Sequence, residues 1–178
     1  ANSKSLIAAS RYLYYRSPIY QKMIHIYADM YCLGCRFIEP PYSFVKNMDV
    51  NQALKQFDST LDFLDKTGMQ NLMNAPLVNM WIEDISFNIF FHDDTGSFMW
   101  RISSDEAIID SIYTVGDSWC YGMAIDMSKW RSAQRQSLIE YLGEPLSSMW
   151  KEYERTNVKY VHVPAEYSFV LKFRTDLM

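Results

Sequence analysis

Apolar residues recur at helical spacing through the first half of the chain. The pattern predicts helices over Ser3–Tyr15, Ile19–Tyr31, Asp49–Lys66 and Ala75–Asp84. Ser17-Pro18 supplies the second helix with an N-cap residue and a proline at its first helical position. That helix has two apolar stripes side by side, so we expect it to be buried on most sides.

The helix over Asp49–Lys66 has the clearest pattern. Its apolar positions follow one another at intervals of four, three, four and three residues: Val50, Leu54, Phe57, Leu61 and Leu64. Such spacing places all five on one face, and we expect this stripe to face the core. Asp49 is a candidate N-cap, and Gly68 closes the other end.

From Ile85 onward the apolar period changes to two, which is typical of strands. Three strand pairs are predicted: Ile85–Phe91 with Phe98–Ile102, Ala107–Thr114 with Trp119–Asp126, and Val158–Val163 with Tyr167–Phe173. A helical segment over Ser137–Arg155 is interrupted at Gly143-Glu-Pro145, and Cys35–Glu39 is extended before Pro40-Pro41. We therefore predict a single α+β domain over residues 1–178, with N-terminal helices followed by antiparallel strand hairpins.

Composition points to extensive contact surfaces. The 178 residues are 49% apolar and 21% charged, which is the range of globular domains. Thirteen Tyr, ten Phe, five Trp and eleven Met are high counts for this length. These residues fill cores and also dominate the centres of protein–protein interfaces. We expect the chain to bury part of its surface against copies of itself or against a partner.

The formal net charge of −4 argues against tight, sequence-independent binding of nucleic acid, which needs a basic surface. The three cysteines cannot all pair with one another, which favours a reducing compartment. Every apolar run is short and carries charge, so no signal peptide or membrane span is predicted.

Cys32-Leu-Gly-Cys35, with Cys120 and His25 elsewhere in the chain, is the arrangement closest to a metal site. Two cysteines at this spacing can face one zinc ion across a glycine turn. A structural zinc site usually needs a second such pair, however, and the chain has none. The two cysteines also lie in an apolar run, where free cysteine behaves as a small hydrophobic residue, so we favour a packing role.

His92-Asp93-Asp94 places an imidazole beside two carboxylates, a set that suits a hard metal ion. The alternative is a solvated hairpin tip, where Asp and Gly satisfy the turn geometry, and this is the interpretation we favour. His25 and Asp29 are one helical turn apart, and a structural helix pair is favoured over an acid–base couple.

A basic and aromatic cluster occupies the first two helices. Its members are Arg11, Arg16 and Lys22 among Tyr12, Tyr14, Tyr15 and Tyr20. In proteins that bind single-stranded nucleic acid, the nucleic-acid bases stack on such aromatic side chains. We favour the alternative that this cluster serves packing, with Arg stacked on Tyr. A glycine-rich phosphate loop, a nucleophile elbow and a helical pair of histidines are all missing from the sequence. We therefore predict no enzyme, no catalytic residue, no metal site and no cofactor.

Several strings occur in an order that resembles the N-terminal part of the portal proteins of tailed bacteriophages, in a group common in phages of Gram-positive hosts. The strings are Ser10-Arg-Tyr-Leu-Tyr14, Ser17-Pro-Ile-Tyr20, Ile26-Tyr-Ala28, Phe37-Ile-Glu-Pro-Pro-Tyr42, Cys120-Tyr-Gly-Met-Ala-Ile-Asp-Met-Ser128 and Pro164-Ala-Glu-Tyr-Ser-Phe-Val-Leu-Lys172. The resemblance covers essentially the whole chain. Each string alone is weakly specific, and their order and spacing are moderately so.

The resemblance implies a structural role in the virion. A portal is a homo-oligomeric ring, typically of twelve subunits, that is located at one vertex of the capsid. It is assembled in the host cytoplasm. Double-stranded DNA passes through it during packaging and ejection without tight binding. Its implied partners are the major capsid and scaffolding proteins, the terminase motor and the head-tail adaptor, with no membrane.

In the family, the part that resembles this chain forms the outer wing, whereas stem, clip and crown lie elsewhere in the subunit. The chain is much shorter than a full portal, and its last strand stops at Met178 without a cap or polar tail. We therefore expect a fragment of a larger subunit. The alternative from another class is a stand-alone adaptor or regulatory module that uses the Tyr-rich helices as a ligand groove. A third, less favoured hypothesis is a metal hydrolase that uses His92, Asp93 and Asp94.

Overall fold

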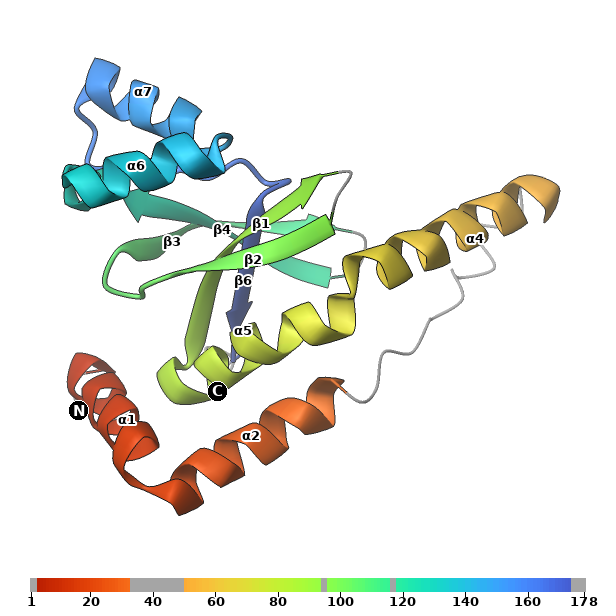
Figure 1. Ribbon diagram of the computed structural model, residues 1–178, viewed down its shortest axis with the longest axis horizontal. Helices are drawn as coiled ribbons and strands as arrows, with labels where there is room; N and C mark the ends of the chain where they lie inside the picture. Colours follow the sequence, from red (N-terminus) through yellow and green to blue (C-terminus); the bar gives the residue numbers. More distant parts are fainter. Residues whose placement is uncertain (1–2, 33–49, 94–95, 116–117, 174–178) are drawn as a thin grey trace.

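Helices lie on both sides of a central pair of antiparallel sheets (Figure 1). This computed structural model describes residues 3–32, 50–93, 96–115 and 118–173. The elements are α1 (Ser3–Arg16), α2 (Pro18–Cys32), α4 (Val50–Thr67), α5 (Met69–Glu83), β1 (Ile85–Asp93), β2 (Gly96–Ile102), β3 (Ala107–Val115), β4 (Ser118–Asp126), the 3₁₀ helix η1 (Met127–Trp130), α6 (Ala133–Leu142), α7 (Leu146–Thr156), β5 (Tyr160–His162) and β6 (Ser168–Lys172). The predicted α+β fold, with helices first and antiparallel strands later, is confirmed.

The first two helices form where the apolar spacing places them. The hydroxyl of Ser17 accepts a hydrogen bond from the backbone N–H of Tyr20 at 3.3 Å, so the predicted cap of α2 is present. Pro18 is the first residue of that helix, as expected. The predicted extended segment Cys35–Glu39 and the Pro40-Pro41 break lie outside the described residues.

Helices α4 and α5 follow each other almost without a linker. Gly68 separates them in a left-handed conformation with φ of 56°, which glycine adopts without steric strain. The predicted start of the fourth helix at Ala75 is wrong, because α5 begins at Met69 and contains Pro76. A proline inside a helix removes one backbone hydrogen bond, but the ring of Pro76 is fully buried, and its packing offsets part of that loss.

Two of the three predicted strand pairs are hairpins. β1 pairs with β2 and β3 pairs with β4, and the first hairpin extends beyond the two predicted strands, because His92 still pairs with Ser97. The third predicted pair is wrong. β6 lies against β1 and β5 lies against β4, which gives the sheet orders β2-β1-β6 and β3-β4-β5. Each late strand therefore covers an edge that a hairpin had left open, and so satisfies backbone groups that a strand edge would otherwise expose.

The main hydrophobic core lies between the two sheets and beneath α6 and α7. Its fully buried members include Ile89 of β1, Met123 of β4, Trp130 of η1 and Leu146 of α7. A second cluster joins α2 to α5 through Ile24, Ala28, Leu77, Val78, Met80 and Ile82. α5 therefore connects the N-terminal helices with the sheet that contains β1.

The two helical pieces predicted around Gly143-Glu-Pro145 are present as α6 and α7. The sequence pattern missed η1, a single short turn whose buried residues are Met127 and Trp130. Asp126 caps this turn by accepting a hydrogen bond from the backbone N–H of Ser128 at 3.2 Å. Four residues are too few to display a helical period, so no apolar spacing could have indicated this element.

Candidate functional site

The cysteines and His25 do not form a site among the residues that the structure describes. His25 hydrogen-bonds the hydroxyl of Tyr14 through Nε2 at 2.8 Å, and Asp29 accepts a hydrogen bond from the amide of Asn74 at 2.8 Å. These contacts take the place of the His25–Asp29 pair considered from the sequence. Cys120 is a half-buried free thiol on β4. Cys32 is the last residue of α2 and Cys35 lies outside the described residues.

His92 lies at the tip of the first hairpin. Its Nδ1 hydrogen-bonds the hydroxyl of Ser97 across the two strands at 2.6 Å. Asp93 pairs with Gly96 in the strand ladder, and Asp94 lies outside the described residues. Within the described ranges, no three His, Cys, Asp or Glu side chains come together as a metal-ligand set. No described helix is both long and apolar enough to cross a bilayer.

Among the described residues of the basic and aromatic cluster on α1 and α2, the predicted stacking of arginine on tyrosine is found for one pair. The guanidinium of Arg16 lies over the ring of Tyr12 at 6.0 Å from its centre. Tyr20 instead hydrogen-bonds the hydroxyl of Ser10 at 2.9 Å, and Arg11 points to carboxylates. The N-terminal helices therefore use their polar groups mainly to hold one another and the body of the protein.

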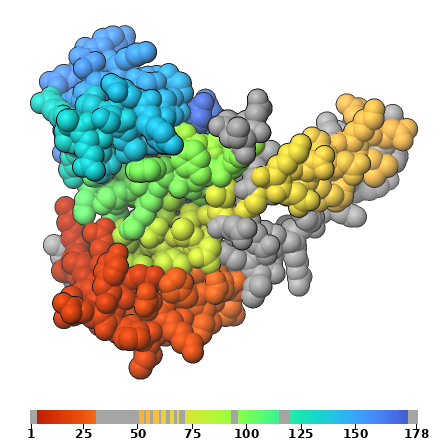
Figure 2. Space-filling model, viewed as in Figure 1, coloured from red at the N-terminus to blue at the C-terminus, as the bar shows by residue number. Residues whose placement is uncertain are grey.

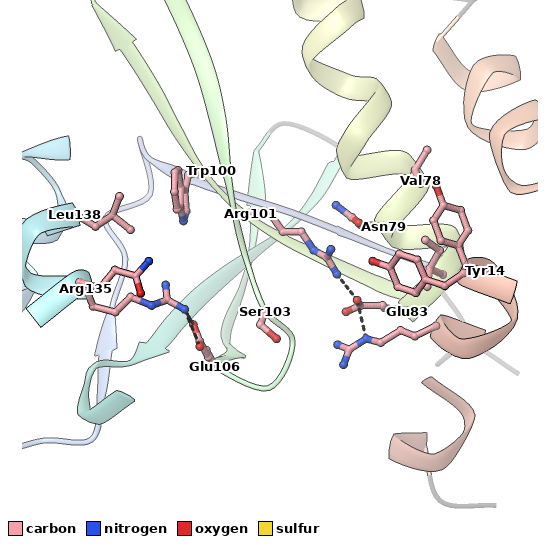
Figure 3. A pocket seen from close by; sticks show the side chains of 14 residues that line it. Tyr14, Val78, Asn79, Glu83, Trp100, Arg101, Ser103, Glu106, Arg135 and Leu138 are labelled. Carbon is pink, nitrogen blue, oxygen red and sulfur yellow. Dashed lines mark hydrogen bonds and ion pairs between the residues drawn. The ribbon is translucent and has the colours of Figure 1, made fainter. Parts of the chain in front are cut away.

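A cleft of about 810 Å³ separates α1 and α5 from α6 (Figure 3). Its charged lining is contributed by Arg11 of α1, Glu83 of α5, Arg101 of β2, Glu106 before β3 and Arg135 of α6. In Figure 3, Glu83 and Arg101 point toward each other at one end, and Glu106 and Arg135 meet at the other. Arg135 donates from Nη2 to both oxygens of Glu106, at 3.0 and 3.3 Å.

Glu83 is the most buried charged group in this cleft. Its side chain is only 3% exposed, and it accepts hydrogen bonds from Nε of Arg11 at 3.0 Å and from Nη2 of Arg101. Burial alone would raise the pKa of Glu83, but the hydrogen bonds from Arg11 and Ser104, with the charge of Arg101, lower the pKa below its ordinary value. The hydrogen bond to Glu83 likewise raises the pKa of Arg11.

This ion-pair cluster fastens α1 to the body of the protein. Besides Glu83, Arg11 reaches the hydroxyl of Ser104 at 2.9 Å and the carboxylate of Asp105 at 3.3 Å, both in the turn between β2 and β3. Each guanidinium in the cleft is paired with a carboxylate, so the charges are largely neutralised. The arrangement supplies a structural clamp, and it presents no nucleophile held by a base.

The most prominent exposed apolar feature is a stripe on α2, formed by Ile19, Met23, Ile26 and Met30, which we call the outer stripe. These side chains are 83%, 43%, 50% and 64% exposed. The opposite face of α2 carries Ile24 and Ala28, which are buried against α5. The expectation that α2 is buried on most sides is therefore wrong: one face enters the core and the other faces solvent.

The apolar stripe of α4 is also exposed. The helix extends away from the sheets (Figures 1 and 2), and Leu54 and Phe57 are 55% and 43% exposed, with Leu61 half-buried. We call these three residues the α4 stripe. The expectation that this stripe faces the core is therefore wrong for Leu54 and Phe57, whereas the side chains of Val50 and Leu64 lie outside those that the structure describes. In Figure 1, α4 runs from its junction with α5 away from the other described elements.

Two exposed apolar stripes on one acidic chain are unusual for a monomer, whose apolar residues on the surface are normally scattered. Sequence periodicity detected both stripes but could not say that they face solvent. The ion-pair cluster was missed entirely, since Glu83 and Arg101 belong to different elements. The acidic pair Glu83-Asp84 at the end of the mostly apolar segment Leu77–Ile85 was the one available signal.

Searches against protein-family models, curated proteins and solved structures find no match to this chain.

Proposed function

We propose that this chain is a structural subunit of a bacteriophage portal ring at the capsid vertex, through which double-stranded DNA is packaged and ejected. The observation that carries the proposal is the outer stripe of α2, exposed along three helical turns. A ring subunit needs such apolar faces for its neighbours, whereas an isolated globule gains nothing from them. The resemblance of the ordered sequence strings to portal proteins supplies the identity of the ring.

Charge supports the same proposal. A net charge of −4 disfavours a firm grip on phosphates, and DNA that must slide through a ring requires a weak grip. The clamp of Arg11 on Glu83 contributes as well, because it holds α1 and, through it, the exposed face of α2 in a fixed orientation. In this proposal, capsid, scaffolding, motor and adaptor proteins bind the assembled ring.

The test uses the product of the complete reading frame that encodes this chain, examined by electron microscopy and native mass spectrometry. We expect closed rings of roughly a dozen copies around a central passage. A stable monomer or a two-fold dimer at high protein concentration contradicts the proposal.

The contribution of the outer stripe to assembly can be tested with a variant of that stripe and a control variant at another exposed apolar position. Ile19→Ser with Ile26→Ser removes two side chains from the outer stripe, and each buried Ile contributes about 1.5–3 kcal/mol to an interface. Association should therefore weaken at least tenfold in sedimentation velocity, with the melting temperature unchanged because neither side chain is in the core. Ile112→Ser on β3, where Ile112 is 60% exposed, is the control and should assemble normally. Equal weakening by the control would count against the outer stripe.

A second candidate, a stand-alone adaptor module, is favoured by the cleft beside Tyr14 and Tyr15, which is large enough to accept a peptide side chain. An adaptor should remain monomeric and lose binding of its partner peptide on substitution of Tyr15. Ring formation by the full-length product argues against it.

A further inference from the structure

We propose that the open edge of β2 binds an extended, uncharged peptide segment of a partner protein, which pairs with β2 as an added antiparallel strand. β2 is the outer strand of its sheet, whose order is β2-β1-β6, so one of its two edges has no neighbouring strand among the described residues. This inference goes beyond the proposed ring, because it concerns a binding site for another protein and does not depend on how copies of this chain assemble.

The cleft between α5 and α6 runs along this open edge. Trp100 and Arg101 are successive residues of β2, so their side chains lie on opposite faces of the sheet, and both line the cleft. In Figure 3, Trp100 lies toward Leu138 of α6, whereas Arg101 lies toward Glu83 of α5. Because β1 occupies the other edge of β2, a cleft that reaches both faces of this strand passes around its open edge.

The strand pairing identifies the backbone groups that face the cleft. The N–H of Phe90 in β1 donates to the carbonyl of Tyr167 at 2.8 Å, on the side of β6. Phe90 pairs with Met99 of β2, and two residues whose backbone groups point away from each other form a non-hydrogen-bonded pair. The N–H and C=O groups of Met99, and of Arg101 two positions later, therefore point away from β1. Within the described ranges, neither residue makes a backbone hydrogen bond outside the strand pairing.

The edge of β2 lacks the features that usually protect a strand edge from pairing. Seven successive residue pairs join β1 to β2 without a register shift, and β2 contains neither proline nor lysine. The edge strand of the other sheet, β3, differs, since its register shifts between Ile109 and Ser111. β2 therefore presents a regular backbone that a further strand can extend.

The side chains of the cleft determine the chemistry of the partner segment. The arginines and carboxylates around the cleft are joined in ion pairs, which are Arg11 with Glu83 and Asp105, Arg101 with Glu83, and Arg135 with Glu106. An uncharged segment leaves these pairs intact, whereas a charged segment competes with them. On the α6 side, Trp100 and Leu138 offer apolar contacts that suit valine. On the α5 side, the amide of Asn79 can hydrogen-bond a hydroxyl group, which suits threonine.

Two isomeric peptides test the pairing on the full-length product. Both are short, capped chains of alternating threonine and valine, and they differ only in whether the threonine or the valine nitrogens carry methyl groups. Directly opposite residues of an antiparallel pair have their side chains on one face, so threonines beside Arg101 direct their N–H groups to β2. In fluorescence anisotropy of a terminal label, the isomer methylated on valine should bind. The isomer methylated on threonine should bind at least about tenfold more weakly, because it cannot donate to β2.

Met99→Pro supplies the corresponding test in the protein. This substitution removes a donor from the open edge alone, because the N–H of Met99 takes no part in the pairing with β1. Binding of the valine-methylated peptide should fall at least about tenfold, with an unchanged circular dichroism spectrum. Tyr141→Ser, at an 86% exposed position outside the cleft, is the control and should bind as the native protein does. If Met99→Pro does not fold, the two peptides decide on the native protein.

Three results would overturn the inference. The first is equal binding of the two isomers, or binding of neither. The second is native affinity of a folded Met99→Pro variant. The third is a complex of two protein copies joined at β2 in place of peptide binding, because the edge then serves self-association.

Discussion

The ion-pair cluster around Glu83 yields a quantitative prediction, because its members differ sharply in exposure. The Glu83 carboxylate is 3% exposed, whereas the side chains of Arg11 and Arg101 are 32% and 42% exposed. Removing the cations and removing the anion are therefore unequal perturbations. The first leaves a dry carboxylate without a counter-ion, and the second leaves guanidiniums that water can reach.

The double variant Arg11→Met with Arg101→Met keeps most of the aliphatic packing and removes both charges. An unpaired buried charge destabilises the folded state by about 3–5 kcal/mol, and we expect a loss at the lower end because Ser104 still reaches Glu83. Glu83→Gln keeps the shape and an acceptor oxygen for both guanidiniums but removes the negative charge, for a loss of roughly 1–2 kcal/mol. Adding Glu83→Gln to the double variant should recover about half of its loss.

The pH dependence supplies an independent check. Because the folded pKa of Glu83 is lowered, its contribution to the free energy of unfolding is complete above the unfolded pKa, about 4.3, and fades as pH falls through the folded pKa. In the double arginine variant, burial without a counter-ion raises the folded pKa, so acid relieves the penalty. The stability gap between the native protein and this variant should be widest near pH 7 and narrow toward pH 4.

Urea unfolding followed by far-ultraviolet circular dichroism measures both quantities. The reasoning is refuted if Glu83→Gln destabilises the protein as much as the double arginine variant at pH 7. A gap that stays constant from pH 7 to pH 4 refutes it as well. Either result would mean that the carboxylate is hydrated in solution and that its partners act as ordinary surface charges.

Two further predictions concern the second sheet and the turn that follows it. A Cβ on Gly122 would clash with the hydroxyl of Ser111 across the β3–β4 pair, so Gly122→Ala should destabilise the protein by about 1–3 kcal/mol, and adding Ser111→Ala should restore most of the loss in thermal unfolding. Asp126→Ala removes the buried cap of η1 and should lower the free energy of unfolding by about 2 kcal/mol. Lys159→Met, which removes only the exposed partner of that carboxylate at 3.4 Å, should have a clearly smaller effect, and an equal effect would contradict the capping explanation.

Most of the secondary structure could be predicted from the sequence alone. The periods of 3.6 and two placed α1, α2, α4 and the two hairpins, because a regular element repeats its contacts along its own length. Residues with special backbone roles were equally readable: Ser17 as a cap, Gly68 as a left-handed stop, and the break at Gly143-Glu-Pro145. Each of these depends on neighbours within a few positions.

Only the tertiary structure decided which strand, side chain or solvent each element contacts. β5 and β6 pair with different sheets, although they are adjacent in sequence, because the edges they cover belong to separate hairpins. Arg11 and Glu83 are 72 residues apart and meet only when α1 packs beside α5. Periodicity identifies an apolar stripe but carries no information on whether protein or water faces it, so the exposure of the stripes on α2 and α4 could be seen only after the chain had folded.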